Sequence, residues 1–144
     1  MTPDDDAVAQ LAQAWASGDG DGVIDSVTPD VVHNVSQGRT QVGVERLADY
    51  LRDLARTRRE RWKDVVILDG PPGRHAIEFT IYGSYLRSIH GLPVANGQSY
   101  VLPAGMFLTA RDGLVGRISM FWNQAEWLRQ ITGEVRVTQT DGGR

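Results

Sequence analysis

The sequence predicts an α+β domain in which helices cover one face of a curved antiparallel sheet. Helical periodicity is concentrated before residue 59 and in a short segment after residue 122. Strand-like patterns dominate from Trp62 to Trp122, and an Arg-Asp-Gly turn joins the last two of them. This separation of helices from strands is typical of α+β domains.

The stretch from Tyr100 to Trp127 is the best-defined part of the prediction. Tyr100 to Ala110 and Leu114 to Trp122 are β-type runs separated by a turn signal, so they predict a hairpin at the centre of the sheet. Asn123 is expected to cap a helix that runs through Ile131, with Glu126 as its capping-box partner.

The upstream segments predict three helices and a short strand. Acidic residues 4–6 begin the first helix, which is expected to end at Gly18. The following elements are expected at Gly20 to Val27 (helix), Val31 to Ser36 (strand) and Val44 to about Arg58 (the longest helix).

The middle of the chain predicts two further long strands. These are Trp62 to Leu68 and His75 to Arg87, separated by an Asp-Gly-Pro-Pro-Gly turn. A loop at Ser88 to Gly97 then leads into the hairpin. We expect one domain over residues 1–134 and a polar tail over residues 135–144.

Composition excludes several classes of protein. The chain has 144 residues, a formal net charge of −3 and no cysteine, with a pI near 5.5. The length predicts one domain, and the acidic charge makes nucleic acid a poor partner. The absence of cysteine excludes disulfides and thiolate metal sites. The acidic N-terminus lacks signal-peptide features, and no apolar run approaches the roughly 20 residues that span a bilayer. A cytoplasmic protein without a membrane partner is therefore expected.

A basic tract covers the polar face of the longest predicted helix and continues beyond its end. It contains Arg52, Arg56, Arg58, Arg59, Arg61 and Lys63, with Asp53, Glu60 and Asp64 interspersed. Such a tract could bind an anion, but the acidic residues largely neutralise it. A solvated helix face is therefore favoured over a phosphate site.

Three segments carry a resemblance to a known superfamily. They are AWASGDGDGVIDSVTPDVVHNVSQG, AIEFTIYGSYL and YVLPAGMFLTARDGLVGRISMFWN. From Leu11 to about Ile131 the chain resembles the NTF2-like superfamily, and within it the SnoaL-like and ketosteroid isomerase-related proteins. The resemblance implies a cone-shaped α+β fold with a deep pocket and homodimers packed through the sheet. Members range from isomerases and cyclases to non-catalytic binding modules.

The resemblance does not extend to the catalytic residues of two related enzyme groups. Ketosteroid isomerases use a tyrosine, an aspartate base and a protonated aspartic acid, whose places fall on Leu11, Asn34 or Val35, and Gly105. None of these side chains can replace its counterpart, because an amide cannot take up a proton near neutral pH and the others lack a donor.

Limonene epoxide hydrolases share only one position. Their asparagine matches Asn34, whereas the remaining places of their site fall on Val32, Phe79, Ile81 and Asn123. The sequence therefore predicts neither mechanism.

Two amides and a histidine are the first candidates for other chemistry. If Asn34 and Asn123 face the pocket, they could orient a carbonyl, a hydroxyl or a water molecule. Alternatively, Asn123 only caps the last helix and Asn34 bonds to backbone. Alternation puts His33 opposite Asn34, which favours a structural or dimer-interface role over a catalytic one.

Tyr85 and Glu78 are the candidates on the strand that begins at His75. Alternation places Ile77, Phe79, Ile81, Gly83 and Tyr85 toward the interior. Tyr85 could then donate a hydrogen bond to a substrate, or be a core aromatic residue with a satisfied hydroxyl. Glu78 would be a base with a raised pKa if it faced inward, and otherwise a partner of an arginine or a dimer-interface residue.

Several apolar residues are expected to contact a hydrophobic ligand, although such residues belong to a core more often. They are Leu11, Trp15, Phe79, Phe107 and Phe121. Trp62, Met120 and Trp122 could form an apolar sheet face used in dimerisation. The histidines show no ligand spacing for a metal, and no phosphate loop or nucleophile motif is present, so no metal or cofactor is expected.

Two functions remain open at this point. One is a small-molecule enzyme that isomerises, cyclises or hydrates a hydrophobic oxygenated substrate, with Tyr85, Asn34 and Asn123 as hydrogen-bond donors. The other is a non-catalytic binding or interaction module, favoured by the loss of the carboxylates used by the related enzymes.

Overall fold

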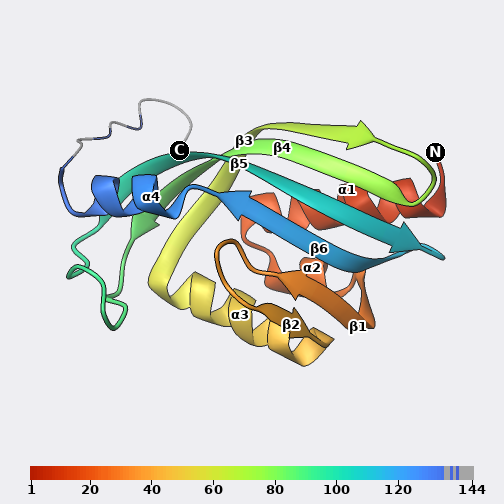
Figure 1. Cartoon of the computed structure of the whole chain (residues 1–144), viewed down its shortest axis with the longest axis horizontal. Coiled ribbons are helices and arrows are strands. Elements are labelled where there is room, and N and C mark those ends of the chain that lie inside the picture. The colour runs from red at the N-terminus through yellow and green to blue at the C-terminus, as the bar shows by residue number, and fades with distance from the viewer. Residues whose placement is uncertain (135–136, 138, 140–144) are drawn as a thin grey trace.

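A computed structural model of the chain describes residues 1–134, 137 and 139. Four helices and six strands make up this part of the chain, and Figure 1 shows their arrangement. In chain order they are α1 (Pro3–Ser17), α2 (Gly20–Ile24), β1 (Val27–Asn34), β2 (Thr40–Val42), α3 (Val44–Thr57), β3 (Arg58–Asp69), β4 (Arg74–Tyr85), β5 (Gln98–Arg111), β6 (Leu114–Trp122) and α4 (Gln124–Ile131).

The strands form one curved sheet in the order β2-β1-β6-β5-β4-β3. The predicted hairpin, β5 and β6, occupies the two central positions, as expected. All neighbouring strands are antiparallel except β1 and β6, which run parallel. Helix α1 contacts β3, β5 and β6, and α3 contacts β1 and β3. The predicted α+β class is therefore confirmed.

Helix α1 has start and stop signals at both ends. The Thr2 hydroxyl accepts a hydrogen bond from the Asp5 amide, and the Asp5 carboxylate accepts one from the Thr2 amide, which completes a capping box. Gly18 ends the helix at φ 79°, in the left-handed region. Its apolar face, including Val8, Leu11 and Trp15, is buried in the core.

Several predicted boundaries were wrong. The second helix ends at Ile24, and Val27 already begins β1, which ends at Asn34 rather than Ser36. Strand β2 was not predicted. Strand β3 begins at Arg58, directly after α3, and not at Trp62. The basic tract from Arg58 to Lys63 therefore belongs to a strand.

The predicted alternation on β4 is confirmed, because all five residues assigned to its interior face are buried. The predicted apolar dimer face was wrong, since Trp62 and Met120 are only 5% exposed and face the core. No helix among the described residues is long and apolar enough to cross a membrane. Most of the predicted tail, 135–144, lies outside the described residues.

Candidate functional site

A pocket of about 580 Å³ lies between the α1–α2 junction, α3 and the first residues of β3. Its apolar wall includes Trp15, Leu51, Leu54 and Leu86. Its charged residues are Asp19, Asp21, Arg52, Arg58, Arg59, Glu60 and Arg61. This lining differs from the largely apolar one that the sequence predicted.

Glu60 is held at the pocket by a tyrosine from the centre of the sheet. The Tyr100 hydroxyl donates to Glu60 Oε2 at 2.5 Å. The two residues lie on β5 and β3, and Gly83 on the intervening β4 pairs with both of them. The Tyr100 ring crosses over Gly83, since a Cβ there would lie 2.2 Å from the ring. Glu60 is thus a pocket carboxylate with one oxygen fixed.

Both tyrosines near Glu60 remain protonated over a wide pH range. Burial, and then the Glu60 charge, raise the pKa of Tyr100. Burial is also the main cause of the raised pKa of Tyr50 on α3. Because its pKa is raised, the Tyr100 phenol keeps its proton near neutral pH and above, and it continues to donate a hydrogen bond to Glu60.

Arg58 supplies a positive charge on the same wall. Its guanidinium carbon lies 5.4 Å from the Trp127 ring centroid, a cation–π distance. Arg58 Nε and Trp127 Nε1 are buried without a hydrogen-bond partner in the described part of the chain. Unpartnered buried donors are uncommon in folded proteins, and a bound ligand is one way to satisfy them.

His33 lies on the inner side of β1, in an aromatic cluster. Its ring is 6.1 Å from Trp15 and 4.8 Å from Tyr50 between centroids, in edge-on geometry. Burial lowers its pKa to about 4, and neighbouring Gln41 only partly offsets this effect. No hydrogen bond of normal geometry joins the two side chains, and both ring nitrogens lack a partner among the described residues. His33 is therefore neutral near pH 7.

The pocket position considered for the two asparagines was wrong, whereas the alternative in which Asn123 caps the last helix is confirmed. Asn34 bonds to side chains and not, as the other alternative had it, to backbone. Asn34 lies on the opposite face from the buried His33, where its amide donates to Ser119 at 2.8 Å and accepts from Thr40 at 2.7 Å. Asn123 is exposed and caps α4 by accepting from the Glu126 amide at 3.0 Å. The Glu126 carboxylate bonds to Arg129 and Gln130, so the expected reciprocal capping bond is replaced. Neither asparagine lines the pocket.

Tyr85 and Glu78 also lie away from the pocket lining. Tyr85 is fully buried, and its hydroxyl donates to the Pro93 carbonyl and accepts from the Ile89 amide. It thereby fastens the loop before β5, which matches the alternative of a satisfied core tyrosine. Glu78 is exposed on the outer face of the sheet, as the alternation along this strand predicted, so the alternative of an inward-facing base was wrong.

The apolar residues predicted to bind substrate fall into three groups. Trp15 lines the pocket. Leu11 and Phe79 are buried in the core, with Phe79 stacked on Trp62 at 3.6 Å between ring centroids. Phe107 and Phe121 are 57% and 55% exposed on the outer face, so their predicted place in the pocket wall was wrong.

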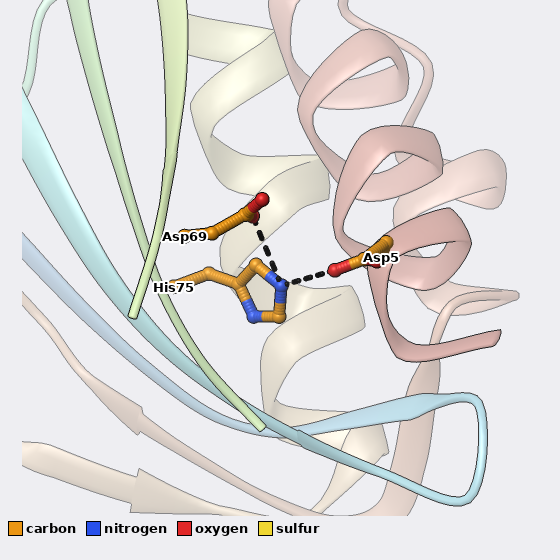
Figure 2. Close-up of side chains that lie close together, drawn as sticks. All are labelled: Asp5, Asp69 and His75. Atoms are coloured by element: carbon orange, nitrogen blue, oxygen red, sulfur yellow. Dashed lines mark hydrogen bonds and ion pairs between the residues drawn. The ribbon is translucent and has the colours of Figure 1, made fainter. Parts of the chain in front are cut away.

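A separate cluster joins the start of α1 to the β3–β4 turn. His75 Nε2 lies 2.8 Å from Asp5 Oδ1 and 3.5 Å from Asp69 Oδ1 (Figure 2). The three side chains have metal-ligand chemistry, with the ligand atoms within 4.8 Å of one another. Because Asp5 already pairs with the ring nitrogen and caps α1, we interpret the cluster as a clamp between helix and hairpin.

Sequence reasoning missed Arg58, Glu60, Tyr50 and Tyr100 as site residues. One signal was available: Arg58, Glu60 and Trp62 alternate, as side chains on one face of a strand do. The cluster around His75 had no such signal, because Asp5 is far in sequence from Asp69 and His75.

The chain is similar to known proteins over most of its length. Residues 8–118 match a family described as SnoaL-like domain. Three similar solved structures are candidate polyketide cyclases from Xanthomonas campestris pv. campestris, Pseudomonas putida KT2440 and Silicibacter sp. TM1040. Their identities are 33%, 36% and 37%, with TM-scores of 0.85, 0.84 and 0.85. The alignments cover 90%, 91% and 89% of this chain and 96%, 98% and 94% of theirs. No curated protein matches the chain.

Proposed function

Because this chain belongs to the SnoaL-like domain family and has its NTF2-like fold, we propose that it is a small-molecule isomerase or cyclase. The reaction takes place in the pocket beside Glu60. Similarity to candidate polyketide cyclases supports this reaction class. The observation that carries the proposal is the Glu60 carboxylate, which lines the pocket and is held by Tyr100 through one oxygen.

Glu60 can act as a general base through its other oxygen. Oε1 removes a proton from a carbon next to a ketone, and the C–H electron pair forms an enolate. In a cyclisation the enolate carbon attacks a second carbonyl of the same molecule, and the resulting alkoxide takes the proton back from Glu60. The substrate and product are isomers, so no oxidant or co-reactant is consumed. The positive charge of Arg58 stabilises the enolate.

Proton exchange on a ketone tests this proposal. 2-Tetralone is incubated with the protein in deuterated buffer, and loss of its C1 protons is followed by NMR. We expect Glu60→Gln to lower the protein-dependent exchange rate by about 100-fold or more. Glu45→Gln is the matched control, because Glu45 is exposed in the first turn of α3 and does not line the pocket.

Two results would overturn the proposal. Equal exchange by the wild type and Glu60→Gln would remove the role of this carboxylate. Binding of 2-tetralone without faster exchange would instead support the non-catalytic binding module.

We also propose that two copies associate through the outer face of the sheet. Phe107 and Phe121 form an exposed edge-on pair there, with ring centroids 5.7 Å apart. Two exposed charged residues lie on the same face near this pair, Glu78 on β4 and Arg117 on β6. In a two-fold arrangement, opposite charges of the two copies can meet around the aromatic pairs. Light scattering tests this: the wild type should be a dimer and Phe107→Asp a folded monomer, whereas a monomeric wild type would refute it.

A further inference from the structure

The basic tract that the sequence assigned to a solvated helix face contributes to the pocket instead. Helix α3 ends at Thr57, so Arg58, Arg59 and Arg61 lie on β3, and all three line the pocket. None of them forms an ion pair with a carboxylate in the described residues. Three arginines without acidic partners at one pocket need an explanation.

Two of these arginines are held in place by the surrounding structure. Arg61 Nη1 donates to the Glu60 carbonyl at 2.7 Å. Its guanidinium packs on Gly18, where a Cβ would lie 2.7 Å from Nη1. Arg58 packs on Trp127, and its Nε is buried without a partner among the described residues. Their guanidinium groups are therefore positioned before any ligand binds.

The acidic residues of the pocket are partly engaged elsewhere. Asp19 accepts from the Gly22 amide and caps α2, and Glu60 accepts from Tyr100. Asp21 lies in the first turn of α2. The fourth arginine, Arg52, is paired with Asp49 outside the pocket lining. The lining holds four arginines and three carboxylates, so its formal charge is positive, and three of the arginines lie on β3.

We propose that the ligand of this pocket is an aromatic carboxylate whose negative charge is recognised by Arg58 and Arg61. The guanidinium fork matches a carboxylate in shape and charge. Trp15 and the leucine side chains of the wall fit a planar apolar body. This inference rests on the proposed function and adds the charge of the substrate to it.

Calorimetric titration of a matched ligand pair tests the inference. 2-Naphthoate and 2-naphthamide have the same ring system and nearly the same shape, but only the first is charged near pH 7. We expect naphthoate to bind the wild-type protein about fivefold or more tightly than the amide. Added salt should weaken the binding of naphthoate and leave that of the amide unchanged.

Substitutions of positively and negatively charged pocket residues show which side chains cause the preference for the charged ligand. Arg58→Gln or Arg61→Gln should weaken naphthoate binding about two- to fivefold without affecting the amide, whereas Asp21→Asn should strengthen naphthoate binding slightly. Arg111→Gln is the matched control, because the side chain of this arginine, at the end of β5, is 87% exposed.

The outcomes separate this inference from the proposed function. Equal affinity for the two ligands, or equal loss in Arg58→Gln and Arg111→Gln, would overturn the charge preference and leave catalysis by Glu60 intact. If neither compound binds while 2-tetralone exchange depends on Glu60, the carboxylate ligand is refuted and the proposed reaction stands.

Discussion

The Tyr100 hydroxyl reaches the Glu60 carboxylate across a whole strand, and the 2.5 Å hydrogen bond passes over Gly83. Glu60, Gly83 and Tyr100 occupy one cross-strand row on β3, β4 and β5. A glycine in the middle of this row lets an aromatic side chain lie flat on the sheet. The hydrogen bond thereby connects β5 of the central hairpin to Glu60 in the pocket wall.

Gly83→Ala should destabilise the fold by about 2 kcal/mol or more, because the added methyl group would displace the Tyr100 ring. Gly105→Ala is a matched control on β5, where a Cβ meets only the Ile77 carbonyl at 3.8 Å. Urea unfolding of both variants measures the difference. Equal stabilities would show that the ring is not confined by Gly83.

Tyr100 should resist ionisation. Burial and the Glu60 charge raise its pKa, and burial raises that of Tyr50, so the Tyr100 phenol stays protonated at about pH 11, where an ordinary tyrosine is ionised. Tyrosinate absorbance of the native protein should therefore rise by less than its four tyrosines would give in an unfolded chain. Tyr100→Phe should leave this rise unchanged. A smaller rise in Tyr100→Phe would contradict the buried, neutral phenol.

His33 should make stability depend on pH. Its pKa is 6.5 in the unfolded chain and about 4 in the fold, so between these values only the unfolded state binds the proton. The free energy of unfolding should thus fall by roughly 3 kcal/mol as pH drops from about 7 to 4. His33→Gln should flatten this dependence. His90→Gln should leave the dependence unchanged, because His90 is exposed. The same pH dependence of the free energy of unfolding in both variants would be evidence against the assignment to His33.

Asp5 should titrate far below an ordinary aspartate. The hydrogen bond from His75, followed by those from Thr2, lowers its pKa from 3.8 to about 2. Its contribution to stability is therefore complete above pH 3.8 and is lost as pH falls through about 2. Carboxyl NMR should show the low pKa in the wild type and in Asp69→Asn, and a higher one in His75→Asn. An unchanged value in His75→Asn would rule out the clamp as its main cause.

The parts of the fold that local patterns encode could be predicted from the sequence. Turn residues at 111–113 located the central hairpin, and alternation identified the buried face of β4. The facing of strand β1 was predicted incorrectly, because the match to site residues of the related enzymes placed Asn34 in the pocket. A register shift between Val27 and Val32 also disturbs simple alternation in this strand. The buried residue is His33, which the fold accepts in its neutral form.

The candidate site was harder to predict because it depends on contacts between distant segments. The arginines were assigned to a helix face, because β3 was expected to begin at Trp62, whereas it begins at Arg58, directly after α3. The Tyr100–Glu60 pair requires the register of three strands, which no local pattern contains. Tyr85 was on the correct face, but its hydroxyl partners come from a loop whose path the sequence does not reveal.

A crystal structure of the protein with 2-tetralone would test the central claim most directly. The account predicts the ring against Trp15 and its C1 atom within about 3.5 Å of Glu60 Oε1, a distance suited to proton transfer. Arg58 would lie on the side of the ketone oxygen. A ligand bound only at the outer face beside Phe107 and Phe121, with the Glu60 pocket free of it, would contradict the account.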